Sequence, residues 1–158
     1  MFGVVNHISE HAVIRMLERI VLSQNIKFTE RKKKFYKNDI KKKMNKDISE
    51  ARFYTYSNDR EYLYVYSPFK NGLKCNKYVI STEGTLVTSI TDIDITDEIK
   101  KYNVYINKSG KTHNIQRIDE YMTCNYIYFK YKIKNYLIIT DKKTSKILSI
   151  KEIEELRD

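Results

Sequence analysis

Three residues with chemically useful side chains recur at intervals of four near the start of the chain: His11, Arg15 and Arg19. In an α-helix each successive member lies about 40° further round the axis, so all three share one face. Histidine suits proton transfer because an imidazole gains and loses a proton near neutral pH. Arginine suits phosphate binding because its planar guanidinium donates two parallel hydrogen bonds to phosphate oxygens. The row therefore predicts acid–base chemistry beside a phosphate.

The three side chains share a face only if the residues around them form a helix. Ser9 directly precedes the row and predicts the helix start, because its side-chain oxygen can accept an otherwise unpaired backbone N–H. We expect this helix to end near Leu22, with an apolar face opposite the row formed by Val13, Met16, Leu17 and Ile20. A second interpretation remains open, in which the row is a solvated face with ion pairs and His11 only packs or caps.

A lysine-rich stretch follows, from Arg31 to Lys46. Thr29 predicts the start of a second helix that reaches about Met44 and has a thin apolar seam, so this helix needs a partner surface to be stable. Its cations are candidate nucleic-acid contacts, because a dense positive face attracts phosphates and releases their counterions. The candidates are Lys32, Lys33, Lys34, Lys37 and Lys41. The alternative is a solvated helix in a lysine-biased proteome.

From Ala51 onward the pattern changes to short alternating runs rich in β-branched and aromatic residues, which are typical of strands. The first runs are separated by turn signals at Ser57–Arg60 and Glu83–Gly84 and predict an antiparallel meander: 53–56, 62–66, 78–80 and 86–90. A short helix is expected within 92–101. Further strands are expected at 104–106, 126–131, 136–139 and 147–150, with a helical turn or two from about Lys151.

The expected fold class is therefore α+β: two N-terminal helices packed on an antiparallel β-meander, with additional C-terminal antiparallel strands and a short terminal helix. We place a candidate boundary at Asp92, which gives a helix-plus-sheet domain at 1–92 and a β-rich C-terminal extension or small second domain at 93–158. Whether the C-terminal strands extend the first sheet or form a second β unit stays open.

Tyrosines in the strand runs are the second candidate binding feature. Tyr54 and Tyr56 share one face of their strand, as do Tyr62, Tyr64 and Tyr66 of theirs. An exposed tyrosine row beside lysines stacks unpaired bases, and we take Tyr54 and Tyr56 as nucleic-acid-binding candidates. The alternative is ordinary sheet packing, because aromatic residues favour strands.

The composition sets the class of partner. The chain has a formal net charge of +10, from 30 Lys and Arg against 20 Asp and Glu, which favours a polyanion. The abundance of Lys, Asn, Ile and Tyr is also expected from an AT-rich genome. Cys75 and Cys124 match neither a metal-ligand spacing nor a C-x-x-C motif, so we expect reduced thiols, a cytoplasmic protein, and no cofactor or metal. The chain lacks a long apolar run and a signal-peptide pattern, so no membrane partner is expected.

The segment from Ser9 to Arg19 has the pattern S-x-H-A-x-x-R-M-x-x-R, and the meander ends in Gly84-Thr-Leu-Val-Thr-Ser-Ile90. Over about residues 7–91 the chain resembles the metal-independent ribonuclease superfamily that groups barnase, the colicin tRNA-cleaving toxins, EndoU and RelE, and most of all its small helix-first domains. The resemblance implies that His11 is the acid–base group, that Arg15 and Arg19 face the phosphate, and that Thr88 or Ser89 is the last-strand hydroxyl that orients it.

The chemistry implied by this resemblance is attack of a ribose 2′-hydroxyl on the adjacent phosphate without a metal ion, with cations stabilising the transition state. The chain departs from the pattern after Arg19, where relatives have a Gly-Ile-Ser turn and this sequence has Ile20-Val-Leu-Ser23. The residues after about Asp92 have no recognised counterpart. A second acid–base group is not distinguished among the lysines, His7, His113, Tyr54 and Tyr56.

Two functional hypotheses follow. The first is a metal-independent endoribonuclease that cleaves tRNA, mRNA or another structured RNA, as a toxin or as a phage or mobile-element effector. The second is a catalytically silent basic binding module that docks on nucleic acid or inhibits a nucleic-acid-handling complex. RNA is the expected partner, and an antitoxin, an immunity protein or a defence complex is the kind of protein partner expected. The sequence predicts no oligomeric state.

Overall fold

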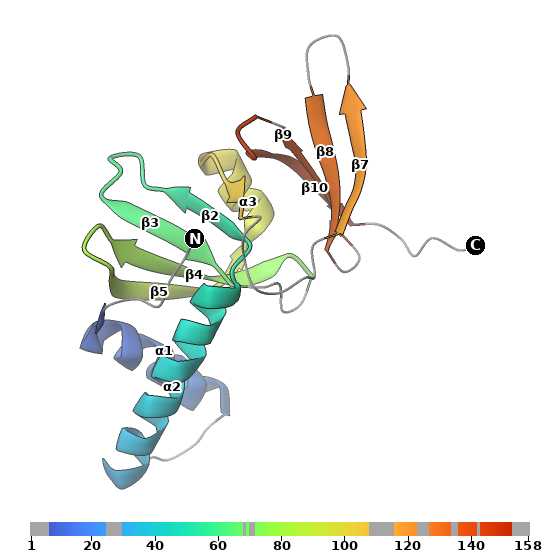
Figure 1. Cartoon of the computed structure of the whole chain (residues 1–158). Helices are drawn as coiled ribbons and strands as arrows, with labels where there is room; N and C mark the ends of the chain where they lie inside the picture. The colour runs from blue at the N-terminus through green and yellow to red at the C-terminus, as the bar shows by residue number, and fades with distance from the viewer. Residues whose placement is uncertain are drawn as a thin grey trace.

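The order of helices and strands places both N-terminal helices on one face of a sheet. The computed structural model describes residues 7–24, 30–67, 69, 72–107, 116–122, 127–133, 136–141 and 143–152. The helices among them are α1 (Glu10–Gln24), α2 (Glu30–Glu50) and α3 (Ile95–Lys101). Figure 1 shows α1 and α2 together below the first sheet, and α3 between the first sheet and the second. The predicted α+β class is confirmed.

The first sheet contains the predicted meander. Its strands are β1 (His7–Ile8), β2 (Phe53–Tyr56), β3 (Tyr62–Tyr66), β4 (Lys74–Ser81), β5 (Thr85–Asp94) and β6 (Tyr105–Ile106), in the order β1-β5-β4-β3-β2-β6. Strands β2 to β5 pair antiparallel in sequence order, β1 runs parallel to β5, and β6 runs antiparallel to β2. The β4–β5 turn has the expected left-handed glycine, Gly84, at φ 86°.

The C-terminal strands form a second sheet with the order β10-β9-β8-β7 and antiparallel pairing throughout. Its strands are β7 (Gln116–Met122), β8 (Ile127–Ile133), β9 (Tyr136–Asp141) and β10 (Ile147–Glu152). The two sheets are joined beside β6, where the Ile147 N–H donates to the Val104 carbonyl at 2.7 Å and the Ile106 N–H to the Ser145 carbonyl at 3.0 Å. Of the C-terminal strands, β6 therefore extends the first sheet, whereas β7 to β10 form a second sheet.

Ser9 fixes the start of α1, as predicted. Its Oγ accepts the backbone N–H of Ala12 at 3.1 Å and donates to the Val87 carbonyl on β5 at 2.8 Å. Its own N–H donates to the Leu86 carbonyl at 3.0 Å, so one serine both caps the helix and ties its first turn to β5. The apolar face expected opposite the His11 row is confirmed where side chains are described, with Val13, Met16 and Leu17 buried.

The helix α2 is longer than expected at its C-terminal end. The apolar seam continues past Met44 to Ile48, and Ile40, Met44 and Ile48 are all buried in the cluster that joins both helices to the sheet. Tyr78 on β4 donates its phenol O–H to Asp47 Oδ2 at 2.6 Å, which ties the last turns to the sheet. The helix therefore ends at Glu50 instead of near Met44.

The first sheet separates two hydrophobic clusters. On the helix-side face, α1 and α2 pack on residues that include Val65, Tyr78 and Leu86. On the opposite face, here called the α3-side face, the sheet packs with α3 and the second sheet through a cluster that includes Phe53, Tyr66, Ile95, Ile138 and Ile147. The predicted alternation along β3 is confirmed, because Tyr64 and Tyr66 belong to the α3-side cluster while Leu63 and Val65 belong to the helix-side one.

The C-terminal end differs from the expectation. Lys151 and Glu152 pair with β9 as part of β10, so the helix expected from about Lys151 does not begin there. Residues 153–158 and the expected helix cap Thr29 lie outside the described residues. The candidate domain boundary at Asp92 falls within β5 and stays a prediction. In the part of the chain that the structure describes, no helix is long and apolar enough to cross a membrane.

Candidate nucleic-acid interface

The row of His11, Arg15 and Arg19 turns from solvent toward the sheet along α1. His11 and Arg15 are exposed, on the side of the helix away from its buried face. Arg19 is half-buried, and its Nη1 donates to the Ser89 carbonyl on β5 at 3.1 Å. The spacing explains the difference, because the third side chain has turned about 80° relative to the first. The structure thus brings His11 and Arg15 together as exposed neighbours, while Arg19 fastens the helix to β5.

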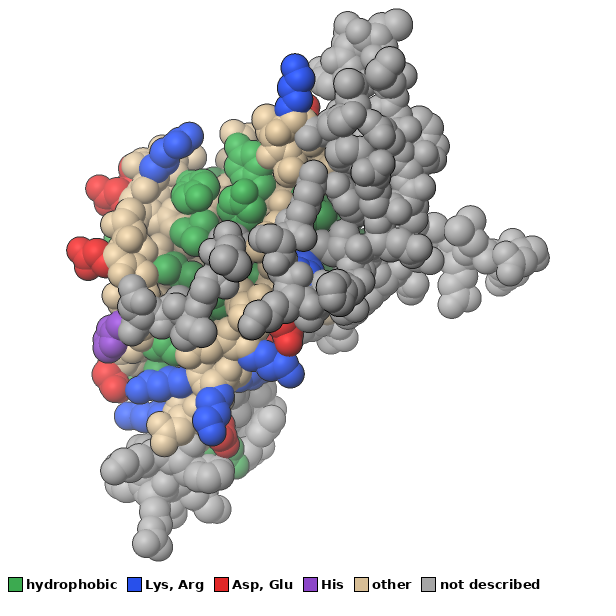
Figure 2. Space-filling model, viewed as in Figure 1, with side chains coloured by type: hydrophobic (Ala, Val, Ile, Leu, Met, Phe, Trp, Pro, Cys, Tyr) green, Lys and Arg blue, Asp and Glu red, His purple; other side chains and the backbone are tan. Residues whose placement is uncertain are grey.

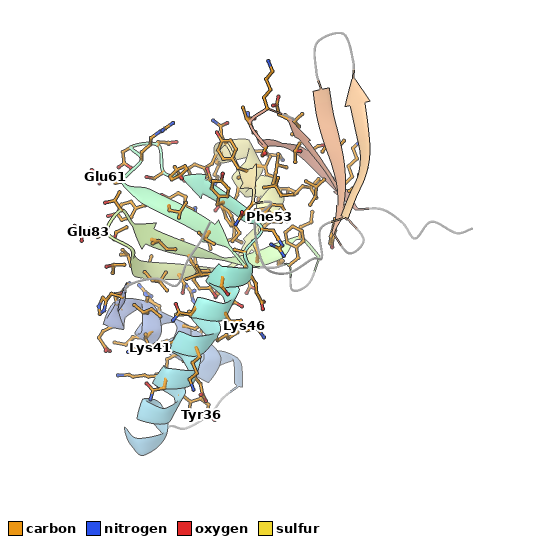
Figure 3. The ribbon with its side chains drawn as sticks, in the orientation of Figure 1. Tyr36, Lys41, Lys46, Phe53, Glu61 and Glu83 are labelled. Atoms are coloured by element: carbon orange, nitrogen blue, oxygen red, sulfur yellow. The ribbon has the colours of Figure 1, made fainter. Side chains whose placement is uncertain are left out.

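One cation of α2, Lys37, lies beside the first turn of α1, and further lysines follow it along α2. Lys37 Nζ is 3.7 Å from Glu10 Oε2, an ion pair that joins the first turn of α1 to α2. Lys41 is half-buried, and the exposed lysines that follow it are Lys42, Lys43 and Lys46. Figure 2 shows Lys and Arg side chains gathered over the region of α1 and α2, and Figure 3 labels Lys41 and Lys46 on α2. The side chains of Lys32, Lys33 and Lys34 lie outside the described residues, although their backbone belongs to α2.

Thr88 and Ser89 lie on opposite faces of β5. Ser89 is opposite Tyr78, faces the helices and is buried, and its hydroxyl has no hydrogen-bond partner within the described structure. Thr88 is opposite Val79 and therefore points to the α3-side face, away from α1. Thr88 is thus not brought together with His11 and Arg15. Of the two hydroxyls, Ser89 is the one on the same side of the sheet as α1.

Tyr54, Tyr56 and Tyr105 form an aromatic patch on the helix-side face, at the β2–β6 edge. Tyr54 is opposite Val65 of β3 on one side and Tyr105 of β6 on the other, which sets the face. The rings of Tyr54 and Tyr105 stack with centroids 5.6 Å apart, and those of Tyr54 and Tyr56 meet edge to face at 6.1 Å. Because α1 packs mainly on β5 and α2 on β3, the patch lies beyond the helices, and Tyr56 is 48% exposed.

Tyr54, at the centre of the patch, stays uncharged over the physiological pH range. Burial, followed by the neighbouring phenols of Tyr56 and Tyr105, raises the pKa of Tyr54 above its ordinary value. A neutral ring with no phenolate charge is compatible with a negatively charged strand passing over it. Figure 2 shows hydrophobic side chains gathered over the sheet, above the basic region of α1 and α2.

A polar pocket of about 280 Å³ opens beside the aromatic patch. We call it the edge pocket. Its walls come from β2, the β2–β3 turn, the end of α3 and β6, and include Thr55, Tyr56, Arg60, Lys101, Tyr102 and Tyr105. Tyr56 is the one member of this set that the sequence singled out. The others come from segments that meet only once β6 pairs with β2, so no local pattern marks them.

A buried ion pair fixes the α3 wall of this pocket. Lys77 Nζ on β4 lies 2.8 Å from Glu98 Oε1, and the two side chains are 9% and 6% exposed. The same ammonium lies 4.1 Å from the ring centroid of Tyr64 and 4.8 Å from that of Tyr102. Lys101 lies one turn after Glu98, and Tyr102, the C-cap of α3, donates its backbone N–H to the Glu98 carbonyl at 2.9 Å, so the pair holds the end of α3 that carries both residues. Tyr64 therefore packs within the fold, as the alternative interpretation of the tyrosine row expects.

Among the described residues, no group of three or more His, Cys, Asp and Glu side chains could hold a metal ion. Comparison with known proteins finds no matching family model, no matching curated protein and no matching solved structure. The site is thus defined by its own geometry, as an α+β chain with two helices, of which α2 is strongly basic, on one face of a mixed sheet and a tyrosine patch at the edge of that face.

Proposed function

We propose that the chain binds single-stranded RNA on the helix-side face of the first sheet. The main support is the position of the aromatic patch on the same face as the exposed His11 and Arg15 and the exposed lysines of α2. Strand β2 is three places from β5, the strand on which α1 mainly packs, and at about 4.8 Å per strand this is roughly 14 Å across the sheet. His11 and Arg15 lie on the outer side of α1, and α2 packs on β3 between the two strands, so an oligonucleotide of several units is needed to contact both groups.

Each group supplies a different part of the binding energy. Stacking of an unpaired base on an exposed aromatic ring contributes about 1–3 kcal/mol, and Tyr56 is the most exposed ring of the patch. Lysine and arginine side chains neutralise phosphates and release counterions, so their contribution falls as salt rises. Duplexes hide their base faces, and we expect them to use the cations alone.

The test is fluorescence anisotropy with labelled oligouridine, titrated at several salt concentrations. Tyr56→Leu should weaken binding about 5- to 100-fold with an unchanged salt dependence, since it removes stacking and no charge. Its matched control is Tyr62→Leu, because Tyr62 belongs to β3 and shares a strand face with Tyr64 and Tyr66. Arg15→Gln should lower the salt dependence, with Lys143→Gln in the β9–β10 turn as the exposed control. Equal effects of Tyr56→Leu and Tyr62→Leu would contradict the proposal.

Metal-independent RNA cleavage is a second candidate function of the same face. The observation that favours it is the exposure of His11 one helical turn from exposed Arg15, an imidazole beside a phosphate-binding group. RNA incubated in EDTA should then yield fragments ending in 2′,3′-cyclic phosphate, and His11→Ala should abolish them. Ile14→Ala is the matched control, because Ile14 is also exposed on α1 and carries neither an acid–base group nor a charge. If the RNA binds but stays intact, the catalytic function is excluded and the binding function stands.

The two outcomes point to different biological roles. Cleavage would make the chain a toxin or a phage or mobile-element effector, with an antitoxin or immunity protein as its partner. Binding without cleavage would suit an inhibitor that occupies the nucleic-acid groove of another complex. In both cases we propose the cytoplasm as the compartment. Its support is Cys75, a buried thiol whose Sγ donates to the Ile93 carbonyl at 3.5 Å.

A further inference from the structure

Two cations border the edge pocket, and no carboxylate is among the described residues that line it. Arg60 comes from the β2–β3 turn and Lys101 from the last turn of α3. Asp59 precedes Arg60, but its carboxylate accepts the Ser57 Oγ–H at 2.6 Å and the Glu61 N–H at 3.0 Å. These hydrogen bonds lower the pKa of Asp59, so its carboxylate stays ionised beside Arg60. The lining itself carries two cations and no carboxylate, which favours an anionic ligand.

Arg60 has a backbone conformation that favours glycine. Its φ of 61° lies in the left-handed region, where a side chain costs conformational energy. The Arg60 N–H donates to the Ser57 carbonyl at 2.9 Å and closes the turn. This turn fixes where the Arg60 side chain leaves the backbone, at the border of the pocket.

The edge of β2 adds a backbone donor to the pocket. The Ser57 N–H donates to the Tyr62 carbonyl on β3 at 2.9 Å, whereas the Arg52 carbonyl accepts the Asn107 N–H on the other side of β2 at 2.6 Å. Since successive residues of an antiparallel strand alternate their hydrogen-bonding sides, the N–H of Tyr56 points away from β3. Strand β6 pairs with the first two residues of β2 and has ended before Tyr56, so this direction leads into the pocket.

We propose that the edge pocket binds one nucleotide unit, with its phosphate between Arg60 and Lys101 and its base stacked on Tyr56. The volume of about 280 Å³ is near the lower end of the range of roughly 300–1,000 Å³ for ligand pockets, which suits one nucleotide and no more. Tyr56 and Tyr105 belong to both the pocket and the aromatic patch, so a strand on the patch can place one of its nucleotides here. The inference rests on the proposed function and names the unit that it recognises.

The test is a titration of the full chain with uridine 5′-monophosphate, followed by backbone amide NMR signals. The nucleotide should shift the signals of Tyr56, Arg60 and Lys101, and uridine or inorganic phosphate alone should bind about tenfold more weakly or worse. Arg60→Gly removes one cation and suits the left-handed backbone, so it should keep the fold and bind the nucleotide about tenfold more weakly. Lys101→Gln should do the same, and Lys100→Gln is its matched control.

Several outcomes would overturn this inference. Equal affinity for the nucleotide and for inorganic phosphate would make the pocket a plain anion site. If both Arg60→Gly and Lys101→Gln bind the nucleotide as tightly as the wild type, the phosphate does not lie between these two side chains. If oligouridine binds and the mononucleotide leaves the pocket signals unchanged, the proposed function stands and the pocket inference fails. If the mononucleotide shifts the pocket signals and oligouridine does not bind, the pocket takes free nucleotides and the proposed function fails.

Discussion

Replacing Lys77 with methionine should destabilise the fold far more than replacing an exposed lysine on the same strand. The Lys77 ammonium and the Glu98 carboxylate are 2.8 Å apart, with 9% and 6% of their side chains exposed, so they form a buried ion pair. The rings of Tyr64 and Tyr102 lie against the ammonium and add cation–π attraction. Loss of the lysine leaves the Glu98 carboxylate buried without its partner.

The expected loss in the free energy of unfolding is about 3–5 kcal/mol, the range for breaking one side of a buried ion pair. A domain is typically stable by only about 5–15 kcal/mol, so Lys77→Met should be folded with little margin. The double replacement Lys77→Met with Glu98→Met removes both charges and fills the space with apolar atoms. It should therefore recover most of the loss.

Urea unfolding followed by circular dichroism measures these differences. The matched control is Lys74→Met, because Lys74 is exposed on β4 and its replacement should change stability by less than about 0.5 kcal/mol. Lys77→Met should also weaken nucleotide binding, since the ion pair positions Lys101 and Tyr102 in the edge pocket. A loss no larger than that of Lys74→Met, or a double variant no more stable than the single one, would refute this reasoning.

Three further predictions concern the elements that support the interface. Ser9→Ala removes the cap of α1 and its tie to β5, so thermal unfolding should show a loss of about 1–2 kcal/mol. Met44→Ala leaves a cavity at a fully buried position, and urea unfolding should show a loss of about 2–5 kcal/mol. Hydrogen bonds from Thr96 lower the pKa of Asp94, so its capping of α3 is complete above the ordinary pKa of 3.8 and is lost as the pH falls through the lowered value. Melting temperatures of the wild type and Asp94→Ala should therefore converge below pH 3.8.

The parts of the fold that depend on near neighbours in the sequence were predictable. The cap at Ser9 and the buried face of α1 follow from spacing within a few residues, and the structure has both. The alternation along β3 is equally local. The extra turns of α2 are a different case, because Ile48 continues the seam of Met44 inside a run dominated by lysines, and the sheet supplies the apolar surface that holds it.

Elements that depend on distant partners were missed. Strand β7 has the polar sequence Gln-Arg-Ile-Asp-Glu-Tyr-Met and is a strand because β8 pairs with its whole length. The parallel pairing of His7 and Ile8 with β5 joins segments about half the chain apart. The sequence of neither segment indicates which strand it pairs with, so composition and periodicity do not predict these strands.

The candidate site divides in the same way. Helical spacing was enough to place His11 and Arg15 on one exposed face, and their roles stay predictions. It was not enough to separate Thr88 from Ser89, because the side of β5 that each faces depends on its register with β4, which shifts between Val79 and Ile80. The edge pocket is further from prediction still, since its walls come from segments of the chain that only the tertiary fold brings together.

The formal charge of +10 favours binding of a polyanion, and the cations that carry it are unevenly placed. Several carboxylates serve the fold itself: Asp47 accepts the Tyr78 phenol, Asp59 and Asp141 hold their turns, Asp94 caps α3, and Glu98 is buried with Lys77. The exposed cations of α1 and α2 gather on one part of the surface (Figure 2). Such a surface attracts any polyanion at low salt, so selectivity must come from the tyrosines and the edge pocket.

This division of roles makes a prediction about competitors. Replacing the exposed lysines Lys42, Lys43 and Lys46 with glutamine should weaken the binding of both oligouridine and duplex DNA, since both are bound there through phosphates alone. Tyr56→Leu should weaken oligouridine and leave the duplex unchanged, because stacked base pairs do not offer a free ring face. Anisotropy competition measures both ratios. If Tyr56→Leu weakens the duplex as much as oligouridine, the aromatic patch does not read unpaired bases and the cations alone explain the binding.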